Sequence, residues 1–144
     1  LLINAYDNSI LYTDWILSSI IDVIGQPNIV SSFTFVSDHG EHINKEGAGH
    51  GGNCSPVKEE YHVPFIFWWS DEYETLHPQK TYNAKLHTHS KINGDCIFYS
   101  ICDMAAIQLD SLYSKTSWSI FSPTFEEHSR LILLPDGINT IAVD

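Results

Sequence analysis

Basic residues are scarce in this chain of 144 residues. It has seven Lys and Arg against eighteen Asp and Glu, and its net charge is −11 with His neutral. Because nucleic-acid binding depends on Lys and Arg that neutralise phosphates, this composition argues against a nucleic-acid partner. An anionic substrate would need positive charge from another source, and a bound cation would supply it.

Long apolar runs and several catalytic signatures are also missing. The run at residues 63–69 has the length of a strand and falls far below the roughly 20 residues that cross a bilayer. No segment resembles a signal peptide, and GxSxG, the P-loop and the dinucleotide fingerprint do not occur. Because the sequence begins at Leu1 instead of Met, we expect a fragment or processed product of a longer chain.

Cysteines are few, and no CxxC pair occurs. Cys96 and Cys102 are six residues apart in a predicted helix, so they point to different faces and should not pair with each other. Cys54 lies in a loop rich in Gly and Pro. One disulfide remains possible, and the odd number of cysteines leaves the redox compartment undecided.

Apolar periodicity predicts alternating helices and strands in a chain long enough for one domain. We expect helices over 6–24 and 95–108, the second capped by Asp95, and short helical turns over 71–76 and 79–89. Strands are expected over 29–36 and 63–69, with a long loop at 37–60 and a hairpin formed by 130–134 and 138–143. This order predicts an α/β sandwich with a largely parallel sheet.

A metal half-site is predicted directly after the first strand. Asp38, His39 and Gly40 follow that strand, and His50 comes eleven residues after His39. Open α/β sheets place ligand sites at the carboxyl ends of strands, and Asp oxygen and His nitrogen are zinc ligands. The alternative is a plain turn, because Asp and Gly are common at strand ends. The strand before it, Glu41 and the later His-Gly pair favour the metal.

Other side chains of this loop have weaker assignments. Glu41, His42 and Glu46 are candidates for partners that orient a metal ligand, with a solvated polar loop as the alternative. Cys54 is close enough in sequence to His50 to be a soft ligand, but an unpaired or disulfide-bonded cysteine is preferred.

Several motifs resemble bacterial phosphoethanolamine transferases, which belong to the sulfatase-like, alkaline phosphatase superfamily. The segment at 4–14 resembles their YDNSILYTD helix, and the Ser-Asp-His-Gly-Glu run at 37–41 looks like their metal motif. His50-Gly51 looks like their downstream His-Gly, residues 63–68 like their VPF strand, and 93–98 like the start of a late helix. The resemblance runs from about Asn4 to Ile107, and the tail after Asp110 matches nothing.

The resemblance implies a fold, a reaction and a set of site residues. The fold would be a partial three-layer α/β/α sandwich of the alkaline phosphatase type, with residues 1–144 as the carboxyl-terminal part of the catalytic domain. Such enzymes transfer phosphoethanolamine from phosphatidylethanolamine to lipid A or another glycan acceptor. Zn²⁺ would be held by Asp38 and His39, and His50 would bind the substrate phosphate or a second zinc.

The resemblance also implies what lies outside the chain. The catalytic domain would face the periplasm below membrane helices of the inner membrane, while these 144 residues themselves would be soluble. The family's nucleophilic Thr and an accompanying Glu precede the segment at 4–14, and neither Thr13 nor Thr34 has their context. We therefore expect the isolated chain to be inactive and, lacking the early strands of its sheet, to expose an edge and part of a core.

Two other functions remain open. One is a sulfatase, phosphodiesterase or other phosphotransferase of the same superfamily. The other is a non-catalytic domain that binds metal or serves as an interaction module.

Overall fold

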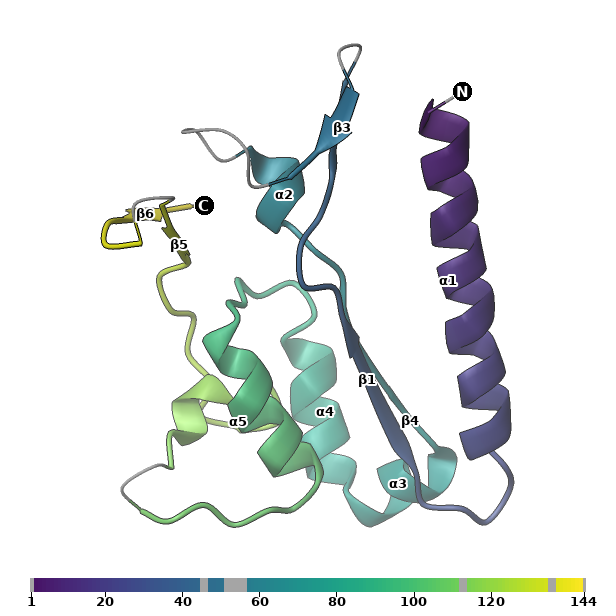
Figure 1. Cartoon of the computed structure of the whole chain (residues 1–144). Coiled ribbons are helices and arrows are strands. Elements are labelled where there is room, and N and C mark those ends of the chain that lie inside the picture. The colour runs from purple at the N-terminus through teal and green to yellow at the C-terminus, as the bar shows by residue number, and fades with distance from the viewer. Residues whose placement is uncertain (1, 45–46, 51–56, 112–113, 135–136, 144) are drawn as a thin grey trace. The chain divides into compact units, whose positions relative to one another are not determined.

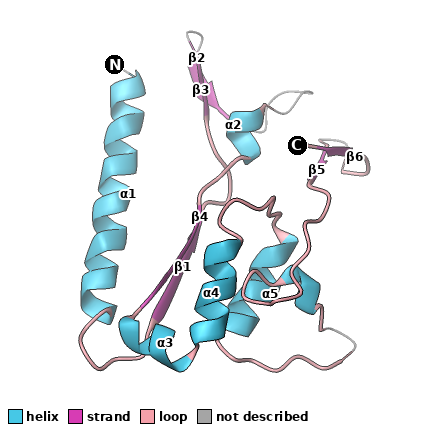
Figure 2. Cartoon of the chain, turned by 180° about the vertical axis from the view of Figure 1, so that it is seen from behind, coloured by secondary structure: helices cyan, strands magenta, loops and turns pink. Residues whose placement is uncertain are grey.

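The computed structural model describes residues 2–44, 47–50, 57–111, 114–134 and 137–143. They fall into two units, residues 1–70 with 134–137, and residues 71–133 with 138–144. Figure 1 shows the elements of both units along the chain, and Figure 2 shows them from behind. In this part of the chain, no helix combines the length and hydropathy needed to cross a bilayer.

The first unit is built from a long helix and a two-stranded ribbon. Its elements are α1 (Leu2–Ile24), β1 (Ser32–Val36), β2 (His42–Asn44), β3 (Gly47–Gly49), α2 (Lys58–Tyr61) and β4 (Phe65–Trp69). Helix α1 begins earlier than predicted and ends as predicted, before Gly25. A Cβ at Gly25 would lie 2.8 Å from the Ile21 carbonyl oxygen and 3.0 Å from the Trp68 ring, so the turn after α1 needs glycine.

The prediction of a largely parallel sheet is wrong for the described residues. Strands β1 and β4 are antiparallel, with Thr34 opposite Phe67, and the pairs β2–β3 and β5–β6 are antiparallel as well. A parallel pair needs a crossover of a dozen or more residues, usually a helix. Between β1 and β4 the chain forms the β2–β3 hairpin and the four-residue α2, where the sequence predicted only a loop.

The second unit holds the apolar core. Its elements are α3 (Asp71–Leu76), α4 (Pro78–Leu86), α5 (Asp95–Met104), the 3₁₀ turn η1 (Thr116–Trp118), β5 (Leu131–Leu133) and β6 (Thr140–Ala142). The predicted helices and the hairpin are therefore present. Asp95 is not the cap of α5: Gly94 precedes the helix and Asp95 is its first residue. The turn residues 135–136 lie outside the described residues.

Several buried and partly buried polar groups of the second unit are paired. Lys80 Nζ lies 3.0 Å from Asp103 Oδ1, and the Ser119 hydroxyl donates to Asp103 Oδ2 at 2.7 Å. The Tyr73 hydroxyl donates to the Met104 carbonyl at 2.6 Å. Burial, with a smaller effect from the Asp103 charge, raises the pKa of Tyr73 to about 12. Cys96 and Cys102 are free and buried, and burial raises the pKa of the Cys96 thiol.

Apolar burial differs sharply between the units. The buried apolar side chains of the described residues all belong to the second unit: Tyr73, Ala84, Cys96, Cys102, Met104, Ile120 and Phe121. Helix α1 buries no residue, and Leu11, Trp15 and Val23 are each more than 60% exposed. A helix that is apolar on most sides is typical of one that packs against further protein.

Candidate metal and phosphate site

The predicted site lies in the segment that follows β1. The Ser37 hydroxyl donates to the His39 carbonyl at 2.8 Å, which folds the chain into a tight bend after the strand. The Gly40 N–H then donates to the Glu60 carbonyl at 2.8 Å, so the segment is fixed against α2. The site residues are thereby held by hydrogen bonds within the first unit.

Gly40 is required here for lack of space. A Cβ at this position would lie 1.9 Å from the carbonyl oxygen of Glu59, which is backbone and cannot swing away. Any side chain would push the segment off α2. Since His39 and Glu41 flank Gly40, the position of both depends on this close approach.

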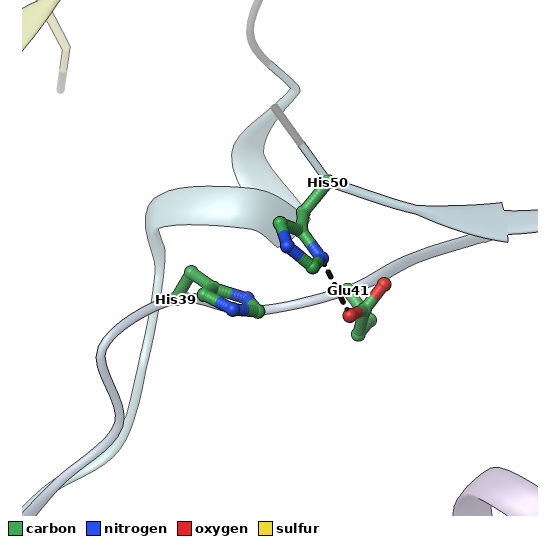
Figure 3. Close-up of side chains that lie close together, drawn as sticks. All are labelled: His39, Glu41 and His50. Atoms are coloured by element: carbon green, nitrogen blue, oxygen red, sulfur yellow. Dashed lines mark hydrogen bonds and ion pairs between the residues drawn. The ribbon is translucent and has the colours of Figure 1, made fainter. Parts of the chain in front are cut away.

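The hairpin brings the distant histidine back to the site. His42 pairs with Gly49 in the antiparallel register of β2 and β3, so the next positions outward are Glu41 and His50. His50 Nδ1 lies 2.7 Å from Glu41 Oε1, within hydrogen-bond distance. The His50 ring also stacks on the His39 ring, with centroids 3.7 Å apart and planes at 27° (Figure 3).

Three donor groups converge at this point. One ligand atom from each of His39, Glu41 and His50 lies within 4.8 Å of the other two, which could hold a metal ion. Two imidazole nitrogens and a carboxylate oxygen form a donor set that suits zinc. The side chain of Glu41 is 29% exposed and that of His50 is 49% exposed, so the group is open to a ligand.

Asp38 lies beside this cluster and is not among its three residues. Its Oδ1 accepts the backbone N–H of His39 at 3.1 Å, and its Oδ2 lies 3.8 Å from His39 Nε2 with the side chain 89% exposed. The structure thus brings the rings of His39 and His50 together, and His50 also contacts Glu41. The assignment of Asp38 and His39 as the metal ligands stays a prediction.

The remaining candidates are not all described. Glu46 and Cys54 lie outside the described residues, and His42 is the first residue of β2. Thr34 lies in the middle of β1. The Thr13 hydroxyl donates to the Ser9 carbonyl on α1.

Comparisons with known proteins agree with the motifs. A family model described as Sulfatase matches residues 2–105. The phosphoethanolamine transferase EptA of Helicobacter pylori is 33% identical over 102 residues, which are 69% of this chain and 18% of that protein. EptC of Escherichia coli K12 is 28% identical over 141 residues, 96% of this chain and 24% of that protein. A Kdo(2)-lipid A phosphoethanolamine 7''-transferase of Salmonella typhimurium is 35% identical over 92 residues, 62% of this chain and 15% of that protein.

The chain spans less than a quarter of the length of each of these three relatives. The resemblance to phosphoethanolamine transferases is confirmed. The match to EptC covers nearly the whole chain and so extends past Asp110, where the motifs showed none. No solved structure gives a significant match.

Proposed function

The chain belongs to the sulfatase family, and from this we propose that it is part of a zinc-dependent enzyme that transfers phosphoethanolamine from phosphatidylethanolamine to lipid A or another glycan. The relatives are named for transfer of this group, two as EptA or EptC and one for lipid A. The observation that carries the proposal is the convergence of His39, Glu41 and His50 after β1.

We assign the metal to Asp38 and His39, and the substrate phosphate to His50. A bound Zn²⁺ supplies positive charge for the oxygens on which negative charge grows during phosphoryl transfer. The nitrogen and oxygen donors at this point fit such an ion. The contact of His50 Nδ1 with Glu41 Oε1 at 2.7 Å fixes the orientation of the ring, as carboxylate partners of functional histidines do, and leaves Nε2 for the substrate.

We propose further that residues outside this chain complete the catalytic domain. The family resemblance assigns the nucleophilic Thr and its accompanying Glu to a segment that precedes residues 4–14. The uncovered apolar surface of α1 supports a partial three-layer α/β/α sandwich, because large exposed apolar patches mark sites that pack against other protein. The isolated 144 residues are then inactive, and the whole enzyme is held in the inner membrane with its catalytic domain in the periplasm.

The test uses the full-length protein and phosphatidylethanolamine with a labelled diacylglycerol moiety. We expect zinc-dependent release of diacylglycerol and a fall of about 10²-fold or more for His39→Ala, the scale for loss of one group that stabilises transition-state charge. His62→Ala is the matched control, because His62 is an exposed histidine of the same unit and is assigned no role.

Three results would contradict the proposal. Hydrolysis of sulfate esters without diacylglycerol release would favour a sulfatase. Zinc binding with neither reaction would favour a non-catalytic domain. Formation of a phosphoethanolamine-enzyme intermediate by the isolated 144 residues would refute the claim that the nucleophile lies elsewhere.

A further inference from the structure

An open hollow of about 610 Å³ adjoins the Glu41–His50 pair. The chain reverses direction in the loop of residues 25–31 between helix α1 and strand β1, so the helix runs antiparallel to β1. Its first turns therefore lie at the end of the unit that carries β2 and β3 (Figures 1 and 2). The hollow therefore has one wall from a helix and the other from the site itself.

The helix wall is one face of the first turns of α1. Leu2, Ala5, Tyr6 and Ser9 line it, and spacings of three and four residues place them side by side on a helix. The Ser9 hydroxyl donates to the Tyr6 carbonyl at 2.7 Å, so its oxygen lone pairs remain acceptors.

The opposite wall carries the charge. Glu41, Ile43, Gly49 and His50 line it, and among the described residues no Lys or Arg lines either wall. Because Oε1 of Glu41 is occupied by His50 at 2.7 Å, we assign the second carboxylate oxygen to the ligand. A carboxylate oxygen that faces a hollow attracts a cationic group.

We propose that Tyr6 and Ser9 form, with Glu41, a subsite for the primary ammonium group of the transferred headgroup. This inference rests on the proposed function. An ammonium has three N–H donors and no acceptor, which the Glu41 carboxylate, the Ser9 hydroxyl and the Tyr6 hydroxyl can accept. The Tyr6 ring adds attraction for a cation, and Leu2, Ala5 and Ile43 contact the two methylenes. Helix α1 thus selects the headgroup while the segment after β1 binds the phosphate.

The test compares two donors with the full-length protein. Phosphatidylethanolamine and phosphatidylethanol differ in the presence of the ammonium, and diacylglycerol release gives kcat/KM for each. We expect the unaltered protein to prefer phosphatidylethanolamine by about tenfold or more. Tyr6→Phe and Ser9→Ala should each lower kcat/KM for phosphatidylethanolamine about tenfold, the scale for a hydrogen bond to a charged group. Neither should change kcat/KM for phosphatidylethanol, so the preference between the two donors narrows. Ser9→Thr, which keeps a hydroxyl, should restore it.

Matched controls lie farther along the same helix. Tyr12→Phe removes an exposed tyrosine hydroxyl, and Ser19→Ala removes a serine that hydrogen-bonds its own helix at the Trp15 carbonyl. Both should leave the preference unchanged. Equal use of the two donors by the unaltered protein, or variants that slow both donors alike, would overturn the subsite while leaving the proposed transfer intact. Release from neither donor would overturn the proposed function and the subsite with it.

Discussion

Replacing Gly40 with alanine tests whether close backbone packing positions the site. The new Cβ would lie 1.9 Å from the Glu59 carbonyl oxygen, whereas Cβ atoms essentially never approach another atom closer than 3.0 Å. The two segments must therefore separate by about 1 Å. That movement would stretch the 2.8 Å hydrogen bond from Gly40 to Glu60 beyond bonding length.

The expected loss combines two effects. Overpacking costs about 1–3 kcal/mol, and a lost backbone hydrogen bond about 0.5–1.5 kcal/mol. Gly40→Ala should therefore lower the free energy of unfolding of the first unit by about 2–4 kcal/mol, measured by urea titration with the fluorescence of Trp68 and Trp69. Because His39 and Glu41 flank the substitution, zinc affinity should fall about tenfold or more.

Gly94→Ala is the matched control. Gly94 has right-handed helical angles, φ −57° and ψ −30°, and a Cβ there would meet nothing within 4 Å. Alanine at such a position should leave zinc affinity unchanged and stabilise by about 0.4–1 kcal/mol. The packing argument fails if Gly40→Ala unfolds and binds zinc like the parent protein.

Further predictions concern the buried polar groups of the second unit. Burial raises the pKa of Tyr73 from 10.0 to about 12, so between pH 10 and 12 the unfolded chain loses a proton that the folded chain keeps. The free energy of unfolding should therefore fall by about 2 kcal/mol by pH 12. Tyr73→Phe should abolish this fall in urea titrations across that range. Asp103→Asn removes the negative charge beside Tyr73 and should lower the Tyr73 pKa, measured by ultraviolet absorbance, and an unchanged value would contradict the charge effect. Ser119→Ala removes the bonds to Asp103 (2.7 Å) and from the Phe121 N–H (3.1 Å) and should cost about 1–3 kcal/mol, whereas the exposed Ser114→Ala should cost nothing.

Local sequence patterns predicted most elements because each signal lies within the element itself. The apolar, aromatic and β-branched runs gave β1 and β4, and periodicity gave α1 and α5. Ile29 and Val30 extended the predicted strand too far, since both lie before β1 and are exposed. The strands β2 and β3 have three residues each, which is too short for alternation to be recognised.

The sequence pattern identified the residues of the site but not the contacts between their side chains. Asp38, His39 and His50 stand out by type and by their place after a strand. The contact of His50 with Glu41 depends on the register of the missed hairpin, in which His42 pairs with Gly49. The sheet direction was missed for a related reason, because it depends on how the chain returns from β1 to β4, and periodicity within a strand does not record its partner.

The site residues lie in the chain segment between β1 and β4, so ligand binding is linked to the pairing of these two strands. Ser32 pairs with Trp69 and Val36 with Phe65, so the whole site segment is a loop whose ends are held by five residue pairs. A ligand that binds only the closed form stabilises it by mass action, by about 2.7 kcal/mol at a hundred times its dissociation constant. The second unit contains none of the site residues. Zinc or a phosphate ester should therefore slow amide hydrogen exchange in β1 and β4 and leave exchange in α5 unchanged.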